Sequence, residues 1–241
     1  MENPGSDMRL QGDGPAPVAS QRHTMRLTLI FLALGLAGAL LQMRAGGGAA
    51  PAPGPRPSLV LLYLSLIASE WMLFKAVRAG IGATGTPWRA LIASFPARSS
   101  HWAIDTAWGL ALFATWLFVI AMATPSSPAP HRAAAQLLLP RGWLEVGLWI
   151  GLSLSAAFCE ELTFRGYFQI QFGAFTRSPA AGLVLQALLF GVAHAYQGPR
   201  SVILIALYGA LFGAVALWRR SLRPGMVAHA LTDLVLGLLA R

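Results

Sequence analysis

The chain contains the sequence WLEVGLWIGLSLSAAFCEELTF at residues 143–164, which is almost wholly apolar until it ends in two adjacent carboxylates. About 20 apolar residues are what an α-helix needs to cross the hydrocarbon core of a bilayer. Further apolar runs lie at about 27–43, 58–78, 102–123, 180–197, 201–218 and 226–240. Long alternating patterns typical of membrane strands are absent from the sequence. We therefore predict an all-α fold, a polytopic integral-membrane helical bundle of about seven transmembrane helices.

The composition agrees with a protein whose solvent is mostly lipid. Of the 241 residues, 56% are hydrophobic and 11% are charged, whereas an average soluble protein has about 25% charged residues. The mean hydropathy is +0.58. A soluble globule could not cover its surface with so few charges, and a disordered chain would not be so apolar. The single cysteine, Cys159, excludes a disulfide scaffold.

The net charge of +9 does not indicate a nucleic-acid partner. The 18 Lys and Arg residues outnumber the 9 Asp and Glu residues, but they are scattered singly and in pairs between apolar runs. A phosphate-tracking protein would gather them into a patch. We interpret the excess as the positive-inside signal of a membrane protein, with contacts to anionic lipid headgroups. Its distribution favours an N-terminus inside and a C-terminus outside.

Acidic side chains within apolar runs are the most informative polar residues. Such a charge costs at least ~2.5–3.5 kcal/mol at the bilayer centre, so it normally has a partner or a function. The six acidic residues in or beside the runs are Glu70, Asp105, Glu145, Glu160, Glu161 and Asp233. We expect Asp105 and Glu145 to reach headgroup water, because they lie near run ends. We expect Glu70 to form a local ion pair with Lys75 or Arg78.

Glu160 and Glu161 stand together and should face different neighbours, because adjacent helical residues point ~100° apart. Glu161 and Arg165 are four residues apart and can pair on one helix face. That pair would leave Glu160 without a local partner. A salt-bridge cluster at headgroup level is the structural alternative.

Two of the five histidines lie in apolar runs, His194 and His229. Asp233 follows His229 by four residues, where its carboxylate could orient the imidazole. Three predicted helices thus each present Glu or His, the residue types that activate water. Hydrolysis inside a membrane needs a polar cavity, and we expect Glu160, His194 and His229 to converge in one.

These residues form three motifs that resemble those of a known family. The motifs are Glu160-Glu161-x-x-x-Arg165, Phe190-x-x-x-His194 and His229-x-x-x-Asp233. In order and spacing they resemble the CPBP intramembrane proteases, which include CAAX prenyl endopeptidases and Abi-like bacteriocin-processing and immunity proteins. The resemblance covers about residues 145–240.

The resemblance implies a role for each motif residue. Glu160 would be the general base, with His194 beside it, and His229 and Asp233 would hold the oxyanion or a metal. Glu161 and Arg165 would support the first motif. A divalent metal such as zinc, held by His194 and His229, is a candidate cofactor. Asp233 departs from the Asn of eukaryotic CAAX enzymes, and an ionised Asp cannot donate to an oxyanion. The sequence leaves metal and glutamate-only mechanisms open.

We accordingly divide the chain into a polar flexible tail at 1–26, N-terminal transmembrane helices at 27–140 and a catalytic core at 141–241. The predicted function is an intramembrane endopeptidase acting on a membrane-embedded or lipid-associated protein or peptide. The expected location is a bacterial inner membrane, where prenylated substrates are less expected. A non-catalytic immunity or scaffold protein on the same fold is the alternative, and a small transporter with a Glu/His proton relay is a third hypothesis.

Overall fold

The structure is a computed structural model that describes residues 16–44, 58–93, 99–123 and 138–239. The N-terminal helices are α1 (Gln21–Arg44), α2 (Val60–Gly82), α3 (Trp88–Ile92) and α4 (Ser99–Ala123). The C-terminal helices are α6 (Gly142–Glu160), α7 (Gln169–Thr176), α8 (Pro179–Ala193), α9 (Pro199–Arg219) and α10 (Arg223–Leu239). A π-helix, Glu161–Phe168, joins α6 to α7, and a 3₁₀ turn, Ala195–Gln197, joins α8 to α9.

The predicted all-α helical bundle is confirmed. Each of the seven apolar runs is helical, and within the described ranges the only β-type pairing is a single bridge between Ala93 and Ser221. Five helical segments are long and apolar enough to cross a membrane, and the protein is an integral membrane protein. They are α1, α2, residues His101–Ala123 of α4, the continuous segment Gly142–Thr176, and α9. The apolar α8 and α10 are shorter.

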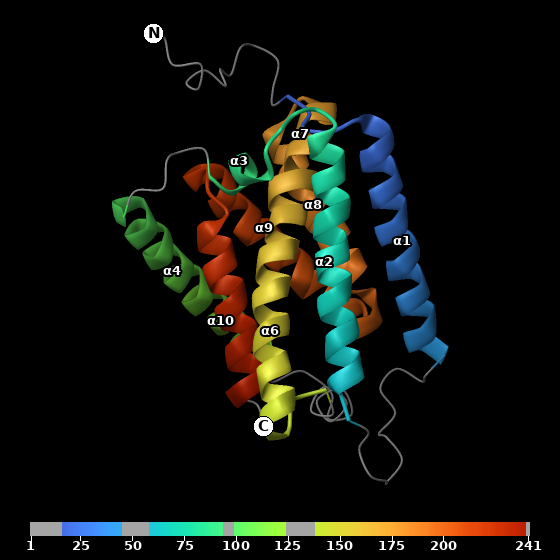
Figure 1. Cartoon of the computed structure of the whole chain (residues 1–241), viewed down its shortest axis with the longest axis vertical. Coiled ribbons are helices and arrows are strands. Elements are labelled where there is room, and N and C mark those ends of the chain that lie inside the picture. Colours follow the sequence, from blue (N-terminus) through green and yellow to red (C-terminus); the bar gives the residue numbers. More distant parts are fainter. Residues whose placement is uncertain (1–15, 45–57, 94–98, 124–137, 240–241) are drawn as a thin grey trace.

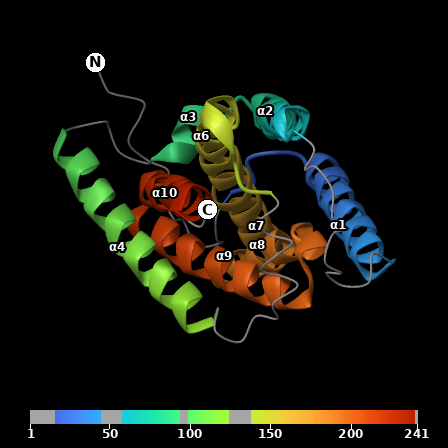
Figure 2. The ribbon, with the colours of Figure 1, turned by 90° about the horizontal axis from the view of Figure 1, so that it is seen from below.

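Helix α6 lies between α2 and α10, and this placement positions the site (Figures 1 and 2). α8 packs against α9, and α10 packs against both α4 and α6. α1 lies at the outer side of the bundle, against α8 and the 3₁₀ turn. This packing brings together three segments that are far apart in sequence. They are the ends of α6 and α8 and the body of α10.

The N-terminal boundary differs from the predicted tail. α1 begins at Gln21, before the apolar run starts. Just before it, the backbone N–H groups of Val18 and Ala19 donate to Oε1 of Gln171 in α7, over 2.6 and 3.1 Å. These buried hydrogen bonds hold the segment against the bundle, because a polar side chain in the interior needs its partners. Residues 1–15 of the predicted tail, and the proline-rich linker at 51–57, lie outside the described residues.

An aromatic core surrounds the π-helix. Phe164, Tyr167 and Phe168 are buried; Phe164 packs against Phe190 of α8, and Tyr167 packs edge-on against Phe168. The Tyr167 hydroxyl contacts the Thr24 hydroxyl of α1 at 2.9 Å. A tyrosine can be buried in this way because its hydroxyl has a hydrogen-bonding partner.

Two glycines let α9 approach its neighbours, as the Gly209-x-x-x-Gly213 spacing predicts. The side-chain amides of two glutamines fill the space that these glycines leave. Gln186 of α8 donates to the Gly209 carbonyl at 2.9 Å, and Gln169 of α7 donates to the Gly213 carbonyl at 3.1 Å. Buried amide bonds of this kind fix how α7, α8 and α9 pack.

Candidate active site

The two glutamates lie where the α-helix α6 passes into the π-helix. Glu160 is the last residue of α6, and Glu161 is the first of the π-helix. In a π-helix the hydrogen bonds run from residue i to i+5, and such segments occur frequently at functional sites. Glu161 is fully buried, whereas the Glu160 side chain keeps 14% of its surface exposed. The adjacent carboxylates therefore lie in different surroundings.

Arg165 neutralises Glu161, as the spacing predicts. Its Nη1 lies 3.1 Å from Glu161 Oε1, and both side chains are buried. The guanidinium carbon is also 4.3 Å from the ring centre of Phe190 and 5.6 Å from that of Tyr208. A guanidinium tolerates such an aromatic setting because ring faces attract cations. This buried group, Glu161 with Arg165 and its aromatic neighbours, is here called the inner corner.

His229 connects the inner corner to the more open side of the site. Its Nδ1 lies 3.1 Å from Glu161 Oε1, a contact between residues 68 positions apart. A carboxylate can only accept, so Nδ1 carries the proton in this hydrogen bond. The Tyr208 ring packs edge-on against the imidazole, with ring centres 5.4 Å apart. The orientation of His229 is thus fixed by a carboxylate from another helix.

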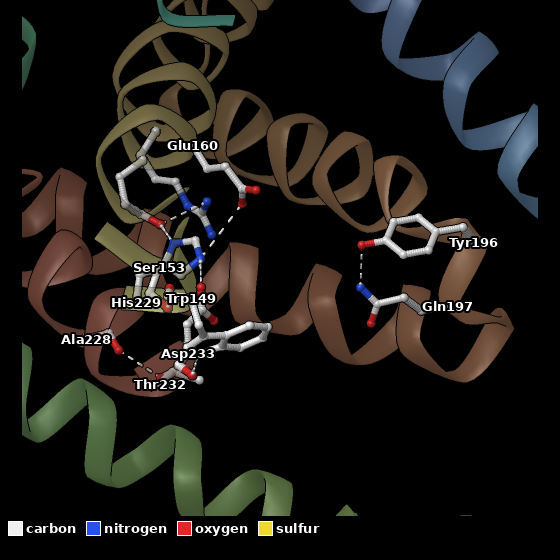
Figure 3. Close-up of polar contacts among 11 residues, drawn as sticks. Trp149, Ser153, Glu160, Tyr196, Gln197, Ala228, His229, Thr232 and Asp233 are labelled. Carbon is white, nitrogen blue, oxygen red and sulfur yellow. Dashed lines mark hydrogen bonds and ion pairs between the residues drawn. The ribbon is translucent and has the colours of Figure 1, made fainter. Parts of the chain in front are cut away.

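The second ring nitrogen of His229 faces two further carboxylates. Nε2 lies 3.9 Å from Glu160 Oε2 and 3.7 Å from Asp233 Oδ2 (Figure 3). Exposure rises outwards from 8% for the His229 side chain to 14% for Glu160 and 33% for Asp233. This group, Nε2 with the two carboxylates, is here called the outer corner. It is the more exposed side of the site.

His194 ends α8. Its Nδ1 lies 2.9 Å from the Phe190 carbonyl, which can only accept, so Nδ1 carries the proton and Nε2 is an acceptor. His194 lies within electrostatic range of Asp233. The structure therefore brings Glu160, His229 and Asp233 into contact at the outer corner, with His194 near Asp233.

Asp105 differs from its prediction. We expected headgroup solvation, but the side chain is fully buried. Its carboxylate lies 3.1 Å from Arg219 Nη2 and 3.6 Å from Arg223 Nη1, and it accepts from the Ser221 hydroxyl at 2.8 Å. All three partners come from residues 219–223, where α9 ends and α10 begins. Asp105 therefore ties α4 to the start of α10, the helix that carries His229.

Glu70 also differs from its prediction. Among the described residues it forms no ion pair with Lys75 or Arg78, and its buried Oε2 has no hydrogen-bonding partner. It lies instead within electrostatic range of Glu160. The helix geometry explains the error, because Lys75 comes five residues later and points ~140° away. Sequence reasoning left Glu70 out of the site, although a carboxylate deep in an apolar run is itself a functional signal.

The described residues do not form a preformed set of metal ligands. In the part of the chain that the structure describes, no group of three or more His, Cys, Asp and Glu side chains is arranged as a ligand set. A zinc site needs at least three protein ligands about 2.0–2.3 Å from the ion. The Nδ1 atoms of the two predicted ligands, His229 and His194, are engaged by Glu161 and by the Phe190 carbonyl, so a metal would bind at their Nε2 atoms. Metal use stays a prediction from the sequence alone.

A comparison with protein families identifies the region that carries the site. Residues 142–235 match the model described as type II CAAX prenyl endopeptidase Rce1-like. The matched region begins at α6 and contains both corners of the site, whereas α1 to α4 lie outside it. Neither the search of curated proteins nor that of solved structures found a match. Over residues 142–235, which carry the site, the chain is thus similar to the Rce1-like, type II CAAX prenyl endopeptidases.

Proposed function

We propose that the protein hydrolyses a peptide bond in a membrane-embedded or lipid-associated protein or peptide, using a water molecule activated by Glu160. The observation that carries the proposal is the outer corner. There, Glu160 and Asp233 both face Nε2 of an imidazole whose other nitrogen is held by Glu161. A base, a proton carrier and a partly exposed approach are the requirements of general base hydrolysis.

In the proposed reaction Glu160 takes a proton from water as the oxygen attacks the carbonyl carbon. A carboxylate suits this step when one oxygen is free to accept, and Glu160 is the more exposed of the two glutamates. The proton then passes to the leaving amine, because a peptide nitrogen must be protonated before its bond to carbon breaks. Protonated Glu160 supplies that proton, either directly or through His194, whose Nε2 accepts the proton and passes it on.

His229 is proposed to stabilise the oxyanion. Its Nε2 faces two carboxylates, which only accept, so a proton on Nε2 is electrostatically favoured. An N–H aimed at the developing negative charge lowers the barrier, and removing such a donor typically costs about 10²–10³-fold in kcat. Asp233 is proposed to orient and charge the imidazole. As an ionised group it cannot replace the donor that Asn would provide.

The test is Glu160→Gln in purified protein reconstituted in liposomes. The reporter is a quenched fluorescent CAAX peptide, prepared with and without a prenyl group, since the family description names such substrates. Gln keeps the size and hydrogen-bonding capacity of Glu but is not a base. Turnover should fall by roughly 10²–10⁴-fold, while the melting temperature holds or rises.

Glu145→Gln is the matched control. Glu145 lies at the other end of α6, where it accepts from the backbone N–H groups of Leu59 and Arg141. Its substitution should leave turnover unchanged. Full activity in a stable Glu160→Gln protein would remove Glu160 from the mechanism and favour the non-catalytic immunity or scaffold function. Cleavage of only one of the two peptides would show whether a prenyl group is recognised.

A further inference from the structure

Helix α1 lies outside the region that the family model matches, yet it touches the turn that carries His194. A Cβ atom at Gly35 would overlap the carbonyl oxygen of Val192 and lie 3.0 Å from its carbonyl carbon. A Cβ atom at Gly38 would lie 2.9 Å from Cβ of Tyr196, which Figure 3 shows on the turn. Val192 comes two residues before His194 and Tyr196 two residues after it. The two contacts therefore flank the histidine.

A third contact lies at the end of the same turn. Gly198 follows the 3₁₀ turn with a φ of +94°, a backbone conformation that favours glycine. A Cβ atom at Gly198 would lie 3.1 Å from Nε2 of Gln42 on α1. Positions 35, 38 and 42 are three and four residues apart, so they share one face of α1. That face lies against the chain from the end of α8 to the start of α9.

Helix α1 is itself held in place by the helix that bears Glu160. In its first turns, the Thr24 hydroxyl accepts from Nε2 of Gln171 in α7 at 2.6 Å. Further along, the ring of Phe31 lies 5.1 Å from that of Phe164 in the π-helix. Both partners belong to the continuous segment that runs on from α6. Contacts of α1 thus connect this segment to the turn that carries His194.

The orientation of His194 depends on that turn because the α-helix has already ended. α8 stops at Ala193, and His194 has φ −100° and ψ 16°. Its N–H donates to the Gly191 carbonyl at 3.1 Å, and its own carbonyl accepts from the N–H of Gln197 at 2.9 Å. These are short-range bonds of the turn itself. A shift of the backbone on either side of His194 would therefore move the imidazole with it.

We propose that Gly35 and Gly38 are positioning residues of the site. By admitting the backbone on either side of His194 to contact with α1, they fix its imidazole where Nε2 takes the proton from Glu160 and delivers it to the leaving amine. The inference rests on the proposed function and commits it to the route through His194. It gives a role to a helix outside residues 142–235. Such support matters, since a misplacement of 1 Å can cost about 10²-fold in rate.

The test measures kcat, KM and melting temperature of alanine variants in the full-length protein in liposomes, with the CAAX reporter peptides. Gly35→Ala has to displace the backbone of Val192 and should lower kcat by about 10- to 100-fold with KM unchanged. Gly38→Ala makes a milder overlap. It should lower kcat by about 3- to 10-fold, and it serves if Gly35→Ala fails to fold. Ala37→Leu is the matched control: it enlarges an exposed position of α1 between the glycines and should change neither kcat nor melting temperature.

A His194→Ala background shows whether the glycines act through the imidazole. His194→Ala alone should lower kcat by about 10²-fold or more, the usual contribution of a positioned proton carrier. Adding Gly35→Ala should then cause no further loss of kcat, because the group that it displaces is already gone. A loss of the same size in both backgrounds would overturn the inference. So would the parent kcat in a folded Gly35→Ala or His194→Ala protein.

A disulfide tests the contact between α1 and the turn independently of any assigned catalytic residue. Gly38→Cys with Tyr196→Cys places two Cβ atoms within a small shift of the about 3.5–4.5 Å that a disulfide spans. The native Cys159 is buried and should not compete. We expect mass spectrometry to show the bond after mild oxidation, and the oxidised protein to cleave the reporter as fast as the reduced one. Failure to link the two positions would contradict the contact. Turnover lost on oxidation and restored by reduction would mean that α1 has to move, which would also overturn the inference.

The outcomes distinguish this inference from the proposed function. If Glu160→Gln remains fully active, the proposed function fails and the inference fails with it. If Glu160→Gln is inactive while folded Gly35→Ala and Gly38→Ala proteins keep the parent kcat, only the role of α1 is overturned.

Discussion

The inner and outer corners of the site contain neighbouring glutamates with opposite settings. At the inner corner, Glu161 is fully buried and shared between Arg165 and His229. At the outer corner, Glu160 is partly exposed and faces His229 across 3.9 Å. The charge of Glu161 is balanced by Arg165 and His229, whereas Glu160 can still accept a proton. The difference shows how one helix end can supply both support and chemistry.

The largest expected effect is on the stability of the inner corner. Arg165→Met would leave the Glu161 carboxylate buried with only His229 as its partner. Breaking a buried ion pair by removing one member costs about 3–5 kcal/mol of unfolding free energy. Thermal melts in detergent should show this loss, and Glu161→Ala should resemble Arg165→Ala. Unequal and additive losses from the two alanine variants would contradict the pairing.

Asp105 allows the comparison to be extended to a buried carboxylate outside both corners. Asp105→Leu would leave Arg223 and Ser221 without their anionic partner. We expect a loss of about 3 kcal/mol, the low end for a broken buried pair, because Arg219 is partly exposed. In protein that stays folded, kcat should be close to that of the parent. A large fall in kcat without a fall in melting temperature would mean that Asp105 belongs to the chemistry.

Gly225 tests how closely α10 approaches the inner corner. A Cβ atom at this position would lie 2.6 Å from Glu161 Oε2. Gly225→Ala should therefore cost about 1–3 kcal/mol through overpacking, and kcat should fall because Glu161 no longer holds His229. Gly147→Ala on α6 is the control: its Cβ would meet nothing within 4 Å. It should stabilise the helix by up to about 1 kcal/mol, since Ala favours helix over Gly.

The smallest expected effect is that of chelation. Because the described His, Asp and Glu side chains do not form a ligand set, dialysis against EDTA should leave peptide cleavage unchanged. Activity that is lost on chelation and restored by zinc would return His194 and His229 to the ligand role that the sequence suggested. Metal analysis of the purified protein provides an independent check.

The sequence predicts the elements better than their contacts. Apolar run length suffices to place the helices, and spacing suffices for the Glu161–Arg165 pair. Which face of a helix points inwards is harder to predict, because helices that are apolar all round have no polar face to mark the outside. The contacts of Asp105 with Arg219, Ser221 and Arg223 and the contact of Glu161 with His229 join residues distant in sequence. They depend on how helices rotate against one another, which no local pattern specifies.

The π-helix has a consequence for how this chain can tolerate insertions and deletions. Removing one residue from Glu161–Phe168 would let the segment wind as an ordinary α-helix, with better local hydrogen bonds and no visible break. A segment with i→i+5 hydrogen bonds has more residues per turn than an α-helix, so its eight residues turn the chain about as far as seven α-helical residues would. A deletion inside the segment would therefore leave Gln171 facing Val18 and Ala19, whereas the same deletion within α6 would turn Gln171 away from them by ~100°. The π-helix is thus a place where this continuous helix can lose a residue and still present Glu160 to the site and Gln171 to the N-terminal segment.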